Sequence, residues 1–202
     1  MIVNLSAYSN PHSCALTIGS FDGMHAGHRA VLEALVKKAA EERLPSVVMT
    51  FVEPPQNYIG AKKELILPSL KKLKMLDEAV DFVVVANFMD FAKMTPGDFF
   101  EEIALKRMKA ASLVVGENFR FGAGRAGDAK TLERMARHHG VDIVAVPLVK
   151  AGGYEVSSTR IRQLLAEGRR AEAEELLGSG LRWEGHAAHQ AQETINKKGT
   201  KG

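Results

Sequence analysis

The chain of 202 residues has a single cysteine and no long apolar run. Cys14 alone can form neither an internal disulfide nor a cysteine zinc cluster. No stretch approaches the roughly 20 apolar residues that a membrane span requires. The start MIVNLSAYSNPHS lacks the basic residues and the long apolar stretch of a secretory signal. We therefore expect a cytoplasmic protein that does not contact membranes.

A strong excess of one charge is also absent. Lys and Arg number 27 against 24 Asp and Glu, which gives a formal net charge of +3. Two basic clusters, around residues 106–109 and 197–201, have no interleaved aromatic residues of the kind that line single-strand binding grooves. Nucleic acid is therefore not expected as a partner, and the mild positive charge is expected to be spread over solvated helix faces.

Strand-like and helix-like segments alternate along the chain, without an internal repeat. Nearly continuous apolar runs, typical of strands buried on both faces, occupy residues 14–19, 46–51, 81–86, 112–116 and 142–146. Helical periodicity or helix start signals occupy residues 28–42, 69–79, 95–108, 127–139, 158–167 and 170–177. The first of these helices places Val31, Leu32, Leu35 and Val36 on one face. This order predicts an α/β fold with a doubly wound parallel sheet of about five strands and helices on both faces. Ligands of such sheets bind at the carboxyl ends of strands, where the winding direction switches.

The stretch LTIGSFDGMHAGH, residues 16–28, joins the first predicted strand to the first predicted helix. Gly23 and Gly27 permit a tight turn and a close approach of the backbone to a ligand. Free N–H groups at the helix start form an anion site, and His25 and His28 can donate hydrogen bonds to phosphate oxygens. Capping or surface histidines are the alternative, and a zinc site would need a third ligand that is not evident nearby.

Two further segments offer groups that bind anions or flat rings. VGENFRFGAGRAGD, residues 115–128, follows the fourth predicted strand and combines an amide, aromatic rings, arginines and four glycines. It is either a long surface loop or a binding loop. In YEVSSTRIRQLL, residues 154–165, Ser and Thr residues suit a helix N-cap. Arg160 and Arg162 oppose the dipole of that helix, which makes sense if an anion binds there.

These three segments meet at one edge of the predicted sheet and indicate chemistry on a nucleotide phosphate. The Walker pattern GxxxxGK[ST] is absent, which argues against the P-loop class. No serine or cysteine nucleophile with a paired base is apparent, so direct in-line transfer is favoured over a covalent intermediate.

The same three segments resemble the motifs of a known family. GSFDGMHAGH resembles the GxFDGxHxGH signature of the bacterial FAD synthetases, within the HxGH nucleotidyltransferase superfamily. VGENFRFGAGRAGD is similar to the VGxDFRFGxxRxGD segment of that family, and VSSTRIRQLLAEGRRAEAEELLG to its SSTxIRxxLxxGxxxxAxxLLG close. The resemblance runs from about residue 14 to residue 178 in the family's order. It implies a Rossmann-like adenylyltransferase domain that joins FMN and ATP, with Mg²⁺, to give FAD and pyrophosphate.

The resemblance also implies roles for individual residues. His25 and His28 would contact the ATP phosphates and stabilise the transition state. The other residues on the ATP side would be Gly19, Ser20, Phe21, Asp22, Gly27, Asn118, Ser157, Ser158, Thr159 and Arg162. Those on the flavin side would be Phe51, Phe119, Arg120, Phe121 and Arg125. No protein metal ligand is implied.

The chain departs from the family pattern at three places. FVEPP at residues 51–55 replaces the usual FEPHP, so Pro55 or Gln56 stands near the position of a histidine, and Asn118 stands where many members have Asp. The missing histidine leaves two alternatives open: an HxGH transferase with another phosphate-bearing acceptor, and a non-catalytic nucleotide- or flavin-binding protein.

The third departure lies at the C-terminal end. Members usually continue past LLGRPY into a riboflavin kinase domain, whereas LLGSGLRWEGHAAH continues only briefly here, so riboflavin phosphorylation is not expected. We expect a nucleotidyltransferase domain over residues 1–178. Residues 179–202 are expected to form a flexible tail, a possible remnant of the kinase domain, in which His186 and His189 are solvated.

Overall fold

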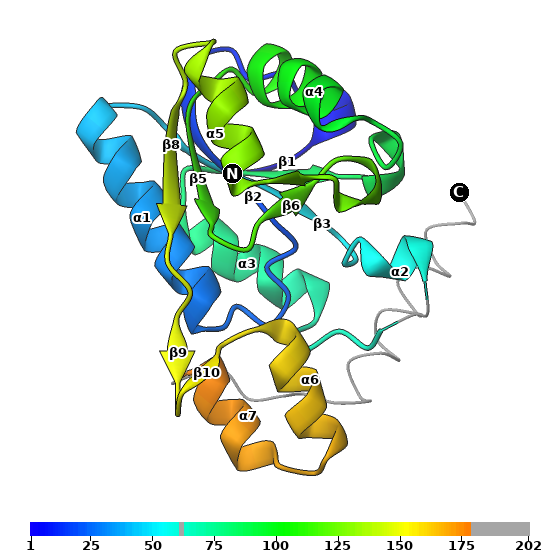
Figure 1. Cartoon of the computed structure of the whole chain (residues 1–202). Coiled ribbons are helices and arrows are strands. Elements are labelled where there is room, and N and C mark those ends of the chain that lie inside the picture. Colours follow the sequence, from blue (N-terminus) through cyan, green and yellow to red (C-terminus); the bar gives the residue numbers. More distant parts are fainter. Residues whose placement is uncertain (61–62, 179–202) are drawn as a thin grey trace.

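A parallel sheet of six strands forms the centre of the structure, a computed structural model that describes residues 1–60 and 63–178 (Figure 1). All neighbouring strands of this sheet pair in parallel. In spatial order they are β1 (Ile2–Asn4), β4 (Phe82–Ala86), β3 (Ser46–Phe51), β2 (Cys14–Ile18), β5 (Ala110–Gly116) and β8 (Asp142–Val146). The expected α/β class with a doubly wound parallel sheet is confirmed.

The sequence predicts five of these strands and misses β1. This strand has only three residues and lies at the sheet edge, where Ile2 to Asn4 pair with Val83 to Val85 of β4. Its residues are exposed or only partly buried. A three-residue edge strand therefore leaves no buried apolar run in the sequence, and the expected strand number of about five is corrected to six.

The order of the strands creates one switch point. From β2 the chain winds outward through β3 to β4, then returns to place β5 on the other side of β2 and continues to β8. The winding direction therefore reverses between β2 and β5. Their carboxyl ends, at Ile18 and Gly116, diverge into a crevice open to ligands.

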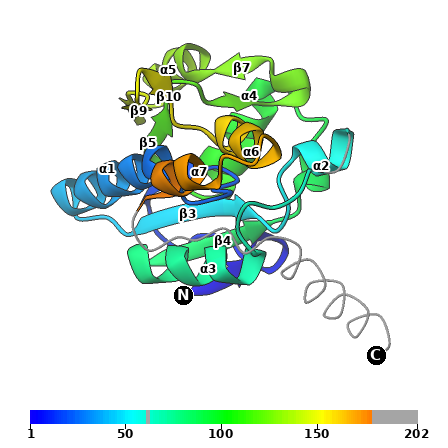
Figure 2. The ribbon, with the colours of Figure 1, turned by 90° about the horizontal axis from the view of Figure 1, so that it is seen from below.

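Helices cover both faces of the sheet, and each face has its own apolar core. Alternate residues of a strand point to opposite faces. Leu16 and Ile18 of β2 belong to one core, and Ala15 belongs to the other. In order, the helices of at least eight residues are α1 (Ala26–Glu42), α3 (Ser69–Ala79), the π-helical η3 (Phe99–Arg107), α5 (Ala129–Arg137), α6 (Ser158–Ala166) and α7 (Arg170–Leu177). Helices α1, α3, α6 and α7 contribute to the core of Ala15, and η3 and α5 to the core of Leu16. Figure 2 shows α6 and α7 side by side.

The predicted helices differ from the observed ones mainly at their ends. In α1 the buried stripe is Leu32, Leu35 and Ala39, whereas Val36 is 42% exposed, so its predicted place on the apolar face is wrong. The helix predicted over residues 95–108 starts as a single turn, α4 (Pro96–Asp98), and widens into η3. There the N–H of Met108 donates to the carbonyl of Ile103, five residues back.

Short elements connect these helices and strands. They are η1 (Leu5–Ala7), α2 (Gln56–Ile59), η2 (Phe88–Asp90) and η4 (Ala123–Arg125), with the hairpin strands β6 (Arg120–Phe121), β7 (Gly127–Asp128), β9 (Lys150–Ala151) and β10 (Tyr154–Glu155). Strands β6 and β7 form a hairpin that takes up the first residues of the helix predicted at 127–139. Helix α5 therefore begins only after Asp128, whose carboxylate caps it by accepting the N–H of Thr131.

No helix of the described part of the chain is long and apolar enough to cross a membrane. The predicted flexible tail at residues 179–202, with His186 and His189, lies outside the described residues.

A side-chain clamp joins the amino ends of β3 and β4 and generates a stability prediction. The Asp81 carboxylate accepts hydrogen bonds from the backbone N–H of Ser46 at 2.8 Å and from its hydroxyl at 2.7 Å. These bonds hold the pKa of Asp81 below its ordinary value. A lowered pKa means that the stabilisation is present at neutral pH and is lost as the pH falls below the ordinary range of Asp.

We expect Asp81→Asn to lower the free energy of unfolding by about 1–2 kcal/mol at pH 7, because a charge-assisted acceptor is lost. The difference in the free energy of unfolding between the variant and the unsubstituted protein becomes smaller as the pH falls toward 3. Urea denaturation followed by circular dichroism measures both effects. Asp90→Asn, at an exposed position, is the control and changes the free energy by less than about 0.5 kcal/mol. Equal deficits at pH 7 and at low pH would contradict the role of the Asp81 charge.

Candidate functional site

A cleft of about 560 Å³ lies at the carboxyl ends of β2 and β5, at the switch point of the sheet. Its walls come from the end of β2 and the start of α1, the loop after β5, the segment after β4 and the start of α6. Of the residues predicted for the site, those that line the cleft are Gly19, Ser20, Phe21, His25, Gly27, His28, Phe51, Asn118, Phe119, Arg120, Phe121, Arg125, Ser157 and Ser158. Asp22, Thr159 and Arg162 are not part of this lining.

The turn between β2 and α1 is strained. Phe21 and Met24 adopt φ values of 50° and 43°, which are uncommon for residues other than glycine. Gly23 has φ 88°, and an added Cβ there would lie 3.0 Å from Ile66. The side chains of Phe21 and Met24 are each only 2% exposed, so their packing holds the turn in this conformation. Backbone strain of this kind concentrates at functional sites.

This turn places the two histidines at the start of α1. His25 is the N-cap, and its Nδ1 accepts the backbone N–H of His28 at 3.4 Å. The two rings stack with centroids 3.7 Å apart and planes 17° apart. His25 is 6% exposed, and the Nδ1 of His28 is buried with no hydrogen-bond partner among the described residues. A buried nitrogen without a partner is uncommon in folded proteins, and this one belongs to a residue of the cleft lining.

Burial keeps both imidazoles neutral. It lowers the pKa of His25 to about 4, with a further contribution from the nearby charge of Arg29. Burial also lowers the pKa of His28 well below its ordinary value, and His25 and Lys72 add to the shift. At neutral pH each ring therefore carries one N–H donor and no net charge. Each neutral ring can donate one hydrogen bond to an anion through its N–H.

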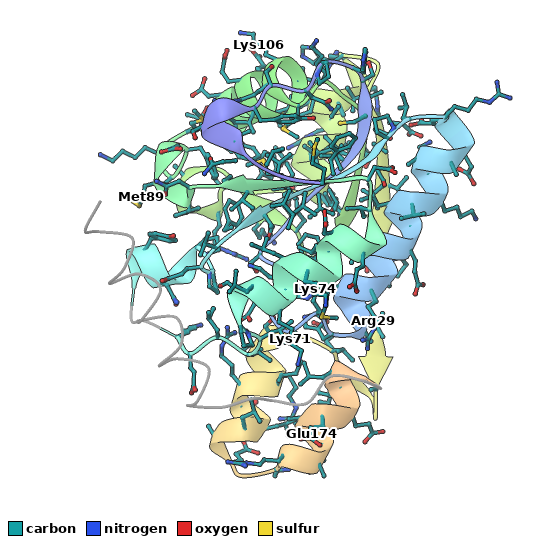
Figure 3. The ribbon with its side chains drawn as sticks, turned by 180° about the vertical axis from the view of Figure 1, so that it is seen from behind. Arg29, Lys71, Lys74, Met89, Lys106 and Glu174 are labelled. Carbon is teal, nitrogen blue, oxygen red and sulfur yellow. The ribbon has the colours of Figure 1, made fainter. Side chains whose placement is uncertain are left out.

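Arg29 links the histidine helix to the last helix of the described chain. Its Nη2 donates to the carbonyl of Leu177 at 2.5 Å, at the end of α7 (Figure 3). Gly178 follows, and a Cβ at that position would clash with the Arg29 guanidinium at 1.9 Å. A glycine with φ 81° is thus required where α7 ends against α1.

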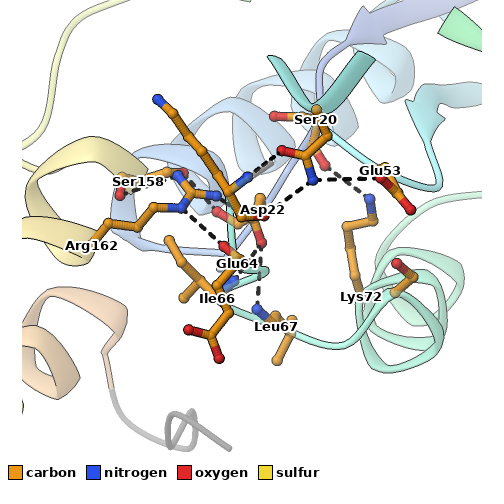
Figure 4. Close-up of polar contacts among 12 residues, drawn as sticks. Ser20, Asp22, Glu53, Glu64, Ile66, Leu67, Lys72, Ser158 and Arg162 are labelled. Atoms are coloured by element: carbon orange, nitrogen blue, oxygen red, sulfur yellow. Dashed lines mark hydrogen bonds and ion pairs between the residues drawn. The ribbon is translucent and has the colours of Figure 1, made fainter. Parts of the chain in front are cut away.

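Asp22 and Arg162, both predicted to contact ATP, pair with each other (Figure 4). Asp22 is 2% exposed, and its Oδ1 accepts the N–H groups of Ile66 at 3.1 Å and Leu67 at 3.4 Å. Burial raises the pKa of this carboxyl, and Arg162 and the two N–H groups oppose the shift. The Ser158 hydroxyl also donates to the Asp22 carbonyl at 2.8 Å. This pair therefore fastens α6 to the turn after β2.

The start of α6 provides fewer free cations than its sequence suggests. Ser157 caps the helix by accepting the N–H of Arg160 at 3.2 Å. The Arg160 guanidinium lies 5.2 Å from the centre of the Tyr154 ring, and Arg162 is held by Asp22. Protein partners thus account for both arginines, so the inference of a bound anion from their place in the first turn is not needed. Thr159 is exposed and does not line the cleft.

The loop after β5 brings its predicted residues into the cleft. Phe119 and Phe121 stack with centroids 5.5 Å apart. Arg120 forms an ion pair with Asp128 at 3.1 Å, whereas Arg125 has no ionic partner among the described residues. Arg125 also has φ 59°. Of the two arginines in this loop, Arg120 is therefore ion-paired and Arg125 is not paired with any described residue.

Sequence reasoning misses most of an aromatic cluster on the same wall. Phe88 and Phe91 follow β4, and the Phe91 ring lies 5.7 Å from Phe51 and 5.6 Å from Phe99. The Phe99 ring in turn lies 5.9 Å from Phe121. The available signal was the position of two phenylalanines just beyond the carboxyl end of a strand. Other lining residues that were not predicted include Thr17, Val31, Pro55, Pro147 and Leu148.

A buried lysine, also not predicted, lies behind the cleft. Lys72 of α3 is 2% exposed, and its Nζ donates to the carbonyls of Ser20 at 3.1 Å and Phe51 at 2.5 Å (Figure 4). Burial lowers its pKa to about 8, and Asp22 opposes that shift. None of the described residues that line the cleft is Asp or Glu. The surroundings of the cleft thus favour an anionic ligand.

Comparisons with known proteins identify the relatives of this chain. The FAD synthetase family model matches residues 7–160. The bifunctional riboflavin kinase/FMN adenylyltransferase of Escherichia coli strain K12 is 39% identical over 180 residues, which cover 87% of this chain. The match covers 58% of the length of that relative. The FAD synthetase of Listeria monocytogenes is 29% identical over 180 residues, covering 87% of this chain and 73% of its own.

A solved structure supports the same fold. A crystal structure of a macrolide-efflux protein from Streptococcus pneumoniae superposes with a TM-score of 0.75 at 30% sequence identity, covering 88% of this chain and 62% of that one. Together with the match over residues 7–160, these likenesses show that the chain belongs to the FAD synthetase family.

Proposed function

We propose that this chain transfers the adenylyl group of ATP to FMN, giving FAD and pyrophosphate. One observation carries the proposal: a single cleft joins a neutral histidine pair at a helix start to an aromatic wall. The first part suits a polyphosphate and the second a flat ring system. The family and the FMN adenylyltransferase relatives support the same substrates.

The start of α1 would bind the ATP phosphates. Its 17 residues give a helix dipole whose positive end faces the cleft, beside backbone N–H groups without helical partners. Gly27 lets the backbone pass close to the His25 ring, because a Cβ there would lie 3.2 Å from that ring. Asp22 and Arg162 would act here by fixing α6 and the turn rather than by touching ATP.

The reaction would be one in-line displacement. A phosphate oxygen of FMN attacks the α-phosphorus of ATP, the bond from that phosphorus to the bridging oxygen breaks, and pyrophosphate leaves. The N–H donors of His25 and His28 would stabilise the charge that develops on the phosphoryl oxygens. Mg²⁺ would enter with ATP, because the described residues offer no group of three His, Cys, Asp or Glu side chains for a metal. When bound, Mg²⁺ supplies positive charge that neutralises part of the negative charge on the phosphates.

The aromatic wall would receive the isoalloxazine ring of FMN. Phe51, Phe91 and Phe121 line the cleft, and contact of a flat ring with aromatic side chains adds to the burial of apolar area. Arg125 would contact the FMN phosphate, because it is the arginine of this loop without an acidic partner among the described residues.

A second candidate function is adenylyl transfer to another phosphate-bearing acceptor. Pro55 lines the cleft near the position where the family has a histidine, so the acceptor side differs from the family pattern. Incubation with MgATP and either FMN, pantetheine phosphate or nicotinamide mononucleotide, followed by chromatography, separates the two. FAD formation supports the first candidate, whereas product from another acceptor alone supports the second.

We expect His28→Ala to reduce kcat for FAD formation by about 10²–10³-fold, the effect of losing one transition-state donor. The measurement is FAD formed at saturating MgATP and FMN. His138→Ala, at the exposed C-cap position of α5, is the matched control. A His28→Ala enzyme with the rate of the control would remove His28 from catalysis.

The neutral state of the histidines can be observed directly. Because the pKa of His25 lies near 4, we expect its ring proton shifts in the free protein to stay constant as the pH falls from 8 to about 5. Those of His28 behave in the same way. Proton NMR of the unliganded protein measures these shifts. Single His→Gln variants assign the ring signals, and the titration of free imidazole serves as the reference. Titration of either ring near pH 6.5 would show that it is not kept neutral by burial.

Arg125 and Arg120 provide a paired test of acceptor recognition. We expect Arg125→Ala to weaken FMN binding about tenfold, because one charge-assisted contact to phosphate is lost. Binding of riboflavin, which has no phosphate, changes less than about twofold. Arg120→Ala weakens FMN binding less, since Asp128 already pairs with Arg120. Flavin fluorescence quenching measures these affinities, and equal losses for FMN and riboflavin would refute a phosphate contact.

A further inference from the structure

Lys72 is a buried charge that the proposed reaction does not use. It is 2% exposed and does not line the cleft. A buried ammonium is costly unless its hydrogens are accepted, and an apolar residue would fill the same space on α3 without that cost. Lys72 instead donates to the carbonyl of Ser20, just after β2, and to that of Phe51, the last residue of β3. The ammonium therefore acts on backbone groups rather than on packing alone.

The bond to the Ser20 carbonyl fixes one peptide plane. The described chain has no cis peptide bond, so the Ser20 carbonyl and the Phe21 N–H point in opposite directions. Thr50 adds a second donor to the same carbonyl, through its hydroxyl at 3.4 Å. The carbonyl faces Lys72, behind the cleft, whereas Ser20 and Phe21 both line the cleft. The Phe21 N–H is thus aimed at the cleft side.

The Phe21 N–H is also unsatisfied within the described protein. No described residue accepts a hydrogen bond from it, although the Phe21 side chain is only 2% exposed. The positive φ of Phe21, 50°, turns the backbone in the way that forms concave anion sites. The same turn leads to His25, so this N–H and the histidine pair lie on one wall of the cleft.

We propose that Lys72 is a positioning residue that holds the Ser20–Phe21 peptide so that the Phe21 N–H donates to the ATP polyphosphate. The inference rests on the proposed function for the identity of the ligand. The ammonium also donates to the carbonyl of Phe51, a residue of the aromatic wall. Lys72 thereby ties the phosphate side of the cleft to the end of β3. If Lys72 acts only by packing, its substitution weakens the binding of every ligand equally. If it acts as proposed, its substitution weakens the binding of the polyphosphate selectively.

Calorimetry on paired variants separates these roles. We expect Lys72→Met to raise the dissociation constant for MgATP about tenfold, the loss of one oriented donor, and to change that for FMN less than about twofold. Lys74→Met, an exposed position on the same helix, changes neither by more than about twofold. Unchanged MgATP binding, or equal losses for MgATP and FMN, in Lys72→Met would overturn the proposal.

A second measurement needs no variant and so does not depend on the folding of Lys72→Met. Ser20–Phe21 is the only Ser–Phe pair in the sequence. Protein labelled with ¹³C-carbonyl serine and ¹⁵N-phenylalanine therefore gives one carbonyl-correlated amide signal, that of Phe21. We expect inorganic pyrophosphate to move its proton resonance downfield in a saturable titration. A signal that does not respond to saturating pyrophosphate would overturn the proposal.

Neither measurement requires turnover, so the two conclusions fail separately. A chain that binds MgATP through Phe21 but forms no FAD would refute the proposed function and leave the role of Lys72 intact. A chain that forms FAD but whose Phe21 amide signal does not respond to pyrophosphate would refute the role of Lys72 and leave the proposed function intact.

Discussion

The ion pair of Asp22 with Arg162 is the interaction on which the cleft depends. The two residues lie 140 positions apart, and no other ion pair found in the described chain joins the turn after β2 to α6. Removing one partner of a buried pair typically costs about 3–5 kcal/mol, because the other charge is left without compensation. Through this pair, α6 and the segment of Ile66 and Leu67 are fixed against the strained turn. The walls of the cleft are therefore set by a charge pair that lies outside its lining.

Most cationic side chains around the cleft have protein partners. Arg162, Arg160 and Arg120 are engaged by protein partners, and Lys72 by backbone carbonyls. What faces the cleft is mostly neutral: imidazoles, backbone N–H groups and aromatic rings. Fixed dipoles of this kind need little reorganisation when charge develops. They would also hold a polyphosphate less tightly than unpaired ammonium groups would, which suits the release of pyrophosphate in the proposed reaction.

The sequence alone was sufficient for five of the six strands, the edge of the sheet at which the site lies and about half of the residues that line the cleft. These features depend on local patterns, such as the apolar run before Gly19 and the glycines around His25. The edge strand β1 was missed because its three residues form no such pattern. The roles of Asp22 and Arg162 could not be read from their motifs, because each looks like a free ligand group until its distant partner is known. Phe88 and Lys72 were missed for a related reason, since only the tertiary fold brings them to the ends of β2 and β3.

The contact between Arg29 and the end of α7 has a consequence for the histidine pair. Arg29 lies next to His28 in α1, and its charge contributes to the low pKa of His25. The position of that charge is fixed by the carbonyl of Leu177, at the last helical turn of the described chain. The electrostatic state of His25 is therefore coupled to the way α7 ends. Any displacement of that turn is transmitted along one side chain to the histidine end of the cleft.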